Sequence, residues 1–418
     1  LLFVLLTALI TLLAVLYREV VDERPPGLYI AALFGFEASL MGMFLTLDLL
    51  EFWLFACLEL IPCTYVLRRW GTGPDPGAAS AAYRRFAVGG LALLLGAVLL
   101  IGWSHARTIG RWSFDAVELS RHPAPDAWQS TIFVLMFYGL AVRLAQFPFH
   151  AWLPIVARDG TLATFGLFLV GIKVGVYALL RFGLTLLPAG VSHWQNFLIL
   201  LGVIGMFYGG ILALMQLGLR RLLAYAAISN TGMLIVGVLS LNQQGLMGTL
   251  LLTIAFGLAA CGLLLTVGLL HRRARTTLLP RLGALFEYQP LTGLMFLIAA
   301  LSTMAMPGTP GFDAAHLLLE GAIAASNWAT AAAVALGNVV TAAFLLWAFQ
   351  RAFLADRREQ RLRPVTQALS RSETALALLV CGALIGLGFY TEPWENLVRI
   401  PVSAITERFA SAPDDTIR

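Results

Sequence analysis

Lys173 is the only lysine in the chain, and it lies inside a long apolar run. An ionisable side chain at bilayer depth costs several kcal/mol and is rarely kept without a function. The amine of a buried lysine also takes up and releases protons more readily than one in water. Two interpretations follow. Lys173 is either a proton station on a path through a membrane, or a cation held in a permanent salt bridge inside a helix bundle.

Glu59 and Arg143 place opposite charges in two other apolar runs. Glu59 lies one turn before Pro62, and a buried carboxylate calls for a nearby cation, which Arg143 or Lys173 would supply. A glutamate–lysine pair that opens and closes is a workable proton switch, because the protonation of each partner depends on the position of the other. The alternative is a static salt bridge.

A second group, Asp313, His316 and Glu320, has the spacing i, i+3 and i+7 and is predicted to share one helix face. His316 is the member that normally titrates near neutrality, so the group is a possible extension of a proton path. Alternatively, Asp313 caps a helix start and Glu320 faces a partner subunit. His150 is a further candidate, although it lies between Pro148 and Pro154 and would equally satisfy backbone groups freed by them.

Composition indicates a polytopic membrane protein. The 418 residues are 59% hydrophobic and 12% charged, with a mean hydropathy of +0.82. Soluble domains carry about twice that share of charge. The net charge of +5 is explained by loop arginines that face anionic lipid, without nucleic acid as a partner. No C-x-x-C pair, glycine-rich nucleotide loop or His/Cys cluster is present, so we expect neither a metal nor a redox cofactor in this chain.

The apolar runs predict about twelve transmembrane helices. They lie near 1–17, 28–47, 49–67, 86–104, 130–149, 162–187, 197–216, 222–242, 246–270, 291–306, 312–325, 330–350 and 374–391. Two junctions, FPFHAWLP at 147–154 and MPGTPG at 306–311, contain the helix breakers proline and glycine. We interpret each junction as a break inside one crossing.

The distribution of arginine supports the broken helices. Arginines gather in the predicted loops 68–85, 217–221, 271–289 and 351–373, whereas the turns at 188–196, 241–245 and 326–329 are nearly uncharged. Loop 105–129 mixes both signs. The arginine-rich loops lie on one side of the membrane only if residues 291–325 make a single crossing, so the positive-inside rule favours that interpretation.

Two sets of five crossings follow residue 28, each with a break in its fourth crossing. Repeats with an odd number of crossings are inverted relative to each other, and matching broken helices point to an ion path near the midplane. The predicted fold is therefore all-α, with two inverted five-helix repeats. The predicted parts are an N-terminal span and loop (1–27), a first repeat (28–190), a second repeat (191–356), and a basic loop, last span and tail (357–418).

Several motifs resemble those of a known family. They are Asp48-Leu49-Leu50 before Glu59-Leu60-Ile61-Pro62, FPFHAWLP (147–154), GIKVGVYALLRF (171–182), RRLLAYAAISNTG (220–232) and MPGTPGF (306–312). Over nearly its whole length, the chain resembles the antiporter-like membrane subunits of respiratory complex I and its photosynthetic relatives. The NuoM/NdhD type, chain 4 of NAD(P)H–quinone oxidoreductase, is the most similar. The family has fourteen spans, so we expect the first two to be absent from this sequence.

The resemblance implies a proton route, a line of titratable groups across the midplane. Glu59 matches the family's glutamate, and Lys173 matches its second lysine. Other positions differ: Arg143 replaces the first lysine, Asn230 and Phe256 replace two histidines, and Ala315 replaces a later glutamate. Arginine holds its proton too tightly to relay it, and Phe and Ala cannot relay at all. The input half, Glu59 to Lys173, is thus predicted to be retained. The output half would need Asp313, His316, Glu320 or water.

These features together predict a proton-translocating membrane-arm subunit of a complex I-like NAD(P)H or ferredoxin:quinone oxidoreductase. Glu59 would gate, Lys173 would be the central station, and Arg143 would be a fixed charge. Other membrane-arm subunits would be the partners, and the bacterial inner membrane or a cyanobacterial thylakoid would be the location. The substitutions favour a specialised isoform, such as those of cyanobacterial complexes devoted to carbon dioxide uptake.

Two other functions stay open. The first is a sodium/proton antiporter subunit of the multi-subunit type, which shares this fold. The second is a structural spacer that no longer conducts, which the losses at Asn230, Phe256 and Ala315 favour.

Overall fold

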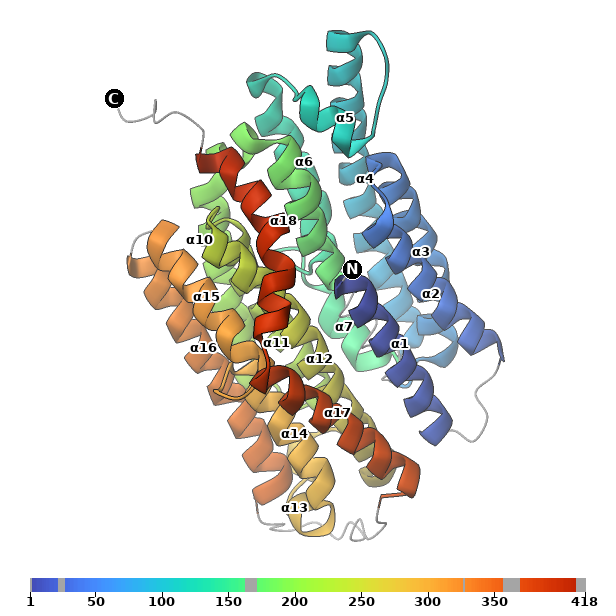
Figure 1. Ribbon diagram of the computed structural model, residues 1–418. Helices are drawn as coiled ribbons and strands as arrows, with labels where there is room; N and C mark the ends of the chain where they lie inside the picture. The colour runs from blue at the N-terminus through green and yellow to red at the C-terminus, as the bar shows by residue number, and fades with distance from the viewer. Residues whose placement is uncertain (1, 22–26, 162–170, 326–327, 356–368, 411–418) are drawn as a thin grey trace.

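The structure, a computed structural model, describes residues 2–21, 27–161, 171–325, 328–355 and 369–410. Helices dominate this part of the chain (Figure 1), and in it the only bridge-type pairs are Asp48 with Asp115 and Gly218 with Leu278. The all-α prediction is confirmed.

The first half contains α1 (Leu2–Val21), α2 (Gly27–Leu45), α3 (Leu49–Trp70), α4 (Pro76–Ile109), α5 (Ala116–Arg121), α6 (Asp126–Arg143) and α7 (Trp152–Asp159). A helix through 171–178 then continues as the π-helical turn η1 (Leu179–Gly183) and α9 (Leu184–Leu186). The start of this predicted crossing, 162–170, lies outside the described residues.

The second half contains α10 (Pro188–Leu214), α11 (Leu219–Val238), α12 (Gln243–Ala274), η2 (Leu279–Arg281), α13 (Leu285–Tyr288), α14 (Pro290–Thr303), α15 (Pro310–Ala325), α16 (Trp328–Phe349), η3 (Gln350–Leu354), α17 (Arg371–Phe389) and α18 (Glu392–Ala410). The loop helices α5 and α13 lie at opposite ends of the bundle (Figure 1).

Eight helices of the described residues are long and apolar enough to cross a membrane. The shorter α1, the broken pairs α6/α7 and α14/α15, and the helix through 171–186 complete the twelve predicted crossings. The chain is an integral membrane protein.

The two broken helices have the same backbone design. Ala145 follows the end of α6 with φ 50°, and Ala305 follows the end of α14 with φ 57°. Each break is closed by the same backbone bonds: Leu144 to Leu140 and Gln146 to Ala141 in the first, Met304 to Ala300 and Met306 to Leu301 in the second. A left-handed alanine is uncommon, so its recurrence at the matching place marks an internal repeat.

Side chains satisfy the carbonyl groups that each break frees. Trp152 Nε1 donates to the Val142 carbonyl at 2.9 Å. At the second break, Asn338 Nδ2 of α16 donates to the Met304 carbonyl at 3.0 Å. Buried backbone groups in a membrane need such partners, so both breaks are stable features of the fold.

Two boundaries differ from the sequence prediction. Arg84 and Arg85 were expected in a loop, but α4 already begins at Pro76 because Asp75 caps its first turn and proline suits that position. Residues after the last span were expected to form a tail, but 392–410 form α18. This helix is too polar to be a span, and it packs against α12. Much of the predicted basic loop, 356–368, lies outside the described residues.

Candidate proton path

Lys173 is enclosed, with 1% of its surface exposed. Its Nζ atom donates a 2.8 Å hydrogen bond to Oδ1 of Asn230 on α11 and lies 4.4 Å from the centre of the Phe256 ring on α12. The amide oxygen and the ring face both stabilise a cation. The structure therefore brings together three residues that the sequence had singled out separately.

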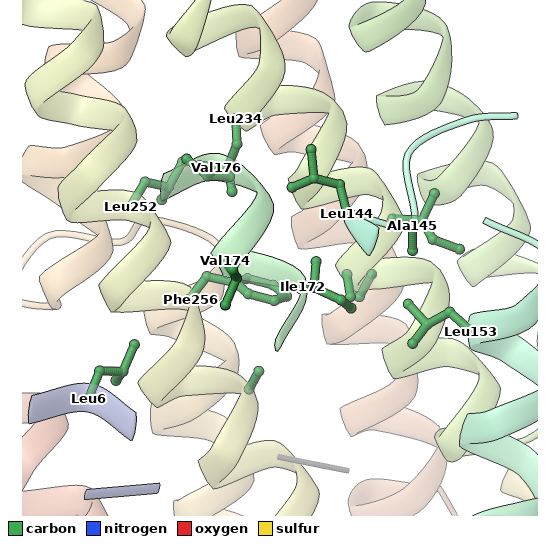
Figure 2. Packing of buried hydrophobic residues seen from close by; sticks show 14 of the residues in the cluster. Leu6, Leu144, Ala145, Leu153, Ile172, Val174, Val176, Leu234, Leu252 and Phe256 are labelled. Carbon is green, nitrogen blue, oxygen red and sulfur yellow. The ribbon is translucent and has the colours of Figure 1, made fainter. Parts of the chain in front are cut away.

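Apolar packing fixes the position of Lys173. Figure 2 shows its neighbours Ile172, Val174 and Val176 on the helical segment, between Phe256 of α12 and Leu144 beside the first break. Gly175 permits this approach, because a Cβ atom there would lie 2.5 Å from the Leu144 side chain. Lys173 thus projects from a close-packed helix at the junction of the two repeats.

Glu59 is buried on α3 and forms an ion pair with Arg143 at the end of α6. The Tyr83 hydroxyl of α4 donates to Glu59 Oε1 at 3.3 Å, and the Cys63 thiol lies 3.8 Å from the same atom. Nε of Arg143 is buried without a hydrogen-bond partner among the described residues. Glu59 is therefore held by one charged group and two weaker donors.

The direct Glu59–Lys173 pair, one of the two predicted partnerships, is not formed. Arg143 holds the carboxylate, and Lys173 bonds Asn230 instead. The two sites are nevertheless adjacent: a Cβ atom at Gly171, two residues before Lys173, would lie 3.5 Å from Glu59 Oε1. A cavity of about 40 Å³ touches Glu59, Arg143 and Gly171, which is room enough for water.

Beyond Lys173, in α11 and α12, hydroxyl side chains take the place of the charged groups found near Glu59. Ser229, Thr231, Thr249 and Thr253 supply buried hydroxyls there, each donating to a backbone carbonyl. Ala315, Asn338 and His316 line a cavity of about 160 Å³ at the second break. The hydroxyls and the amide can hold water but do not titrate near neutrality, so His316 is the titratable side chain of this cavity.

Asp313, His316 and Glu320 do not form one site. His316 pairs with Glu320 at 3.2 Å on the outer surface, where the side chains are 62% and 48% exposed. Asp313 instead accepts a 2.6 Å hydrogen bond from Thr391, between α17 and α18. Positions i and i+3 point about 60° apart around a helix, and here that difference separates the groups.

His150 is buried at the first break, where its ring packs 4.9 Å from Tyr208 and 5.8 Å from Phe147. Its Nδ1 atom has no hydrogen-bond partner among the described residues. The expectation that His150 satisfies freed backbone groups is therefore not met. Trp152 has that role.

Tyr83 and Cys63 were not recognised in the sequence as part of the site. Cys63 follows Glu59 by four residues, so its place on the same helix face was a usable signal. Tyr83 reaches Glu59 only through the packing of α4 on α3, and no local pattern indicates that contact.

Comparison with known proteins identifies the family to which the chain belongs. A profile of the family "NADH:quinone oxidoreductase/Mrp antiporter, TM" matches residues 46–341. The chain belongs to this family. The match contains Glu59, Arg143, Lys173, Asn230 and both breaks, so the path described above lies wholly within the family's shared region.

Relatives extend the similarity over the whole chain. NADH-quinone oxidoreductase subunit M of Escherichia coli (strain K12) is 28% identical over 100% of this chain and 82% of its own length. NAD(P)H-quinone oxidoreductase chain 4 2 of Thermosynechococcus vestitus is 27% identical over 98% of this chain and 77% of its own length.

Two solved structures agree with this chain in fold. A chain of respiratory complex I from Thermus thermophilus with bound NADH has a TM-score of 0.88 and 30% identity, covering 97% of this chain and 84% of its own. A chain of the Mrp complex from Dietzia sp. has a TM-score of 0.86 at 21% identity, covering 97% and 83%, a likeness of fold alone.

Proposed function

We propose that the chain is a proton-translocating membrane-arm subunit of a complex I-like NAD(P)H or ferredoxin:quinone oxidoreductase. Other membrane-arm subunits are its partners, and the redox cofactors lie in other chains. The similarity to subunit M and chain 4 proteins supports this assignment. The predicted specialisation for carbon dioxide uptake stays a prediction.

The observation that carries the proposal is the enclosure of Lys173 between Asn230 and Phe256, on a helix that also touches Glu59. An ammonium group buried at this depth is retained at a cost, and it is a group that can release its proton. Water in the cavity beside Glu59 would supply the proton. The guanidinium of Arg143 stays charged and fixes Glu59 electrostatically.

Operation would alternate between two arrangements. In the structure, Glu59 is held by Arg143 and Lys173 by Asn230. A shift of the helix through 171–178 that loosens the Asn230 bond and opens the cavity would let the ammonium pass its proton to water. Such a shift would move a proton without any redox group in this chain. A subunit that is driven by redox chemistry in other subunits requires this kind of coupling.

A second function, a non-conducting spacer, is favoured by Phe256 and Ala315. Phe256 covers Lys173 on one side, and Ala315 is not titratable, which leaves the largely exposed His316 as the titratable side chain that lines the cavity at the second break. In that case Lys173 and Arg143 would be structural cations, and the subunit would only transmit contacts along the membrane arm.

Proton movement by the intact complex in proteoliposomes tests the proposal. Acidification would be followed with a pH-sensitive dye after addition of electron donor and quinone, in sodium-free and in sodium-containing buffer. We expect acidification without sodium, and a lower proton-to-electron ratio in Glu59→Gln at equal turnover. Acidification that requires sodium would support the antiporter function instead. An unchanged ratio in Glu59→Gln would favour the spacer.

A further inference from the structure

A large pocket opens on the arginine-rich side of the bundle, away from the proton path. It lies between the α3–α4 turn, the end of α7, the start of α11 and the end of α12, and has a volume of about 560 Å³. Its lining includes Arg158, Arg220, Arg221 and His271. The proposed function uses none of these side chains.

Nearby carboxylates offset the positive charge of the pocket only in part. Asp159 is fully buried and is bound by the neighbouring Arg158, whose Nε and Nη2 donate to it at 2.8 and 2.6 Å. Asp159 also interacts electrostatically with Arg220, and Asp75 with Arg158, but neither carboxylate forms an ion pair with Arg220 or Arg221 within the described part of the chain. Three arginines against two carboxylates leave the pocket with an excess of positive charge, which makes it attractive to an anion.

Arg220 has unused hydrogen-bonding capacity. Its side chain is only 6% exposed, and its Nη1 donates to the carbonyls of Arg158 and Gly160 at 3.1 and 3.4 Å. Its Nε and Nη2 are buried without partners among the described residues, as is Nδ1 of His271. Buried guanidinium donors without acceptors are rare and costly, so they indicate that an acceptor belongs here.

The start of α11 adds a further attraction for an anion. The helix begins at Leu219, whose N–H donates to the Thr277 carbonyl, and its N-cap residue Gly218 has no side chain to accept from the N–H groups that follow. The positive end of the helix dipole, in a helix of 20 residues, therefore faces the pocket that Gly218, Arg220 and Arg221 line. Backbone and side chains favour the same negative ligand.

The rim of the pocket is apolar. Met215, Leu217 and Leu278 line it and expose 69%, 59% and 41% of their surfaces. Exposed apolar side chains next to the buried Arg220 and the exposed Arg221, at the ends of membrane spans, suit a ligand with a charged head and hydrocarbon chains. A free inorganic phosphate would use the arginines but not the rim.

We propose that this pocket binds an anionic phospholipid, with its phosphate on Arg220, Arg221 and the start of α11, and its acyl chains along the apolar rim. Because Arg220 also holds the carbonyls that end α7, the bound headgroup would brace the first broken helix. This binding does not depend on whether the subunit conducts protons.

Titration of the purified full-length chain in detergent, read by native mass spectrometry, tests the proposal. The probes are dioleoyl phosphatidylglycerol, dioleoyl phosphatidylcholine and inorganic phosphate. We expect one tightly bound phosphatidylglycerol, with affinity lower by about tenfold or more in Arg220→Gln and in Arg221→Gln, because each loses a charge-assisted contact. Arg221 is exposed, so its variant keeps the test valid if Arg220→Gln fails to fold.

Arg84→Gln is the matched control, because Arg84 is an exposed arginine on the same side of the bundle and outside the pocket. Its affinity for phosphatidylglycerol should equal that of wild type. The proposal is overturned by equal affinities in all variants, or by equal binding of phosphatidylcholine. Displacement of the lipid by millimolar inorganic phosphate would assign the pocket to a free anion and overturn the lipid assignment.

Discussion

The ammonium group of Lys173 donates a 2.8 Å hydrogen bond to the amide oxygen of Asn230. Lys173 belongs to the last crossing of the first five-helix set and Asn230 to α11 of the second, so this bond joins the two sets. The amide oxygen stabilises the charged amine but cannot accept its proton. Lys173 can therefore hold a proton there, while release must go to water.

Replacing Asn230, the hydrogen-bond acceptor of Lys173, should reduce the coupling of proton transfer to electron transfer. Asn230→Leu leaves the buried ammonium without an oxygen partner, which costs about 1.5–3 kcal/mol for a bond to a charged group. We expect a lower proton-to-electron ratio in proteoliposomes at normal assembly. Asn230→His, which restores a polar partner, should pump at least as well as wild type. Equal ratios for the Leu and wild-type complexes would show that the bond has no role in coupling.

The Glu59–Arg143 pair should show strong coupling in stability. Either Glu59→Gln or Arg143→Gln leaves a buried charge uncompensated, at a cost of about 3–5 kcal/mol. The double variant should lose much less than the sum of the two. The check is the unfolding free energy of the detergent-solubilised chain in sodium dodecyl sulfate. Additive losses would mean that the two side chains act independently.

Phe256 should limit the movement of protons beyond Lys173. Phe256→His replaces the phenyl ring that covers the ammonium with a smaller imidazole, which is titratable. We expect a higher proton-to-electron ratio than wild type. Phe256→Leu is the control, since it removes the ring without adding a relay, and it should not raise the ratio. A His variant no better than the Leu variant would place the limit elsewhere on the path.

A buried carboxylate on the arginine-rich side should anchor α17. Glu373 is 1% exposed, bonds Arg272 at 3.0 Å, pairs with Arg273 and closes a capping box with Ser370. Glu373→Gln should lower the unfolding free energy by about 3 kcal/mol, because it removes a buried carboxylate that pairs with the enclosed Arg273.

The control for that measurement is Glu320→Gln, which removes the exposed pair with His316. An exposed pair contributes about 0.5 kcal/mol or less, so this variant should unfold like wild type. If both variants lost the same stability, burial would not distinguish the two carboxylates.

Periodicity and charge were enough to predict most of the fold. The proline and glycine junctions at 147–154 and 306–311 predicted both broken helices. The placement of the arginines predicted that residues 291–325 cross the membrane once. The start of α4 and the existence of α18 were missed. Hydropathy alone identifies long apolar segments. The start of α4 instead depends on the Asp75 cap, and α18 depends on one apolar stripe of an otherwise polar helix.

The sequence was enough to predict which residues form the candidate site, but not which side chains contact each other. Lys173, Asn230 and Phe256 were each singled out in the sequence, yet only packing of three separate helices brings them into contact. The choice of Arg143 over Lys173 as the partner of Glu59 depends on the tertiary contact between α3 and the end of α6, which no local pattern encodes. Likewise, the i, i+3 spacing of Asp313 and His316 could not show which of them faces outward.

The most direct measurement is the proton-to-electron ratio of the reconstituted intact complex with Lys173→Ala in this subunit. Arg181→Ala is the matched control, because Arg181 is an exposed basic residue eight positions further along the same crossing. If Lys173 is the proton station, its variant assembles normally and either pumps fewer protons per electron or loses turnover, while the control matches wild type. An unchanged ratio and unchanged turnover in Lys173→Ala would contradict the proposal and make Lys173 a structural cation of a spacer subunit.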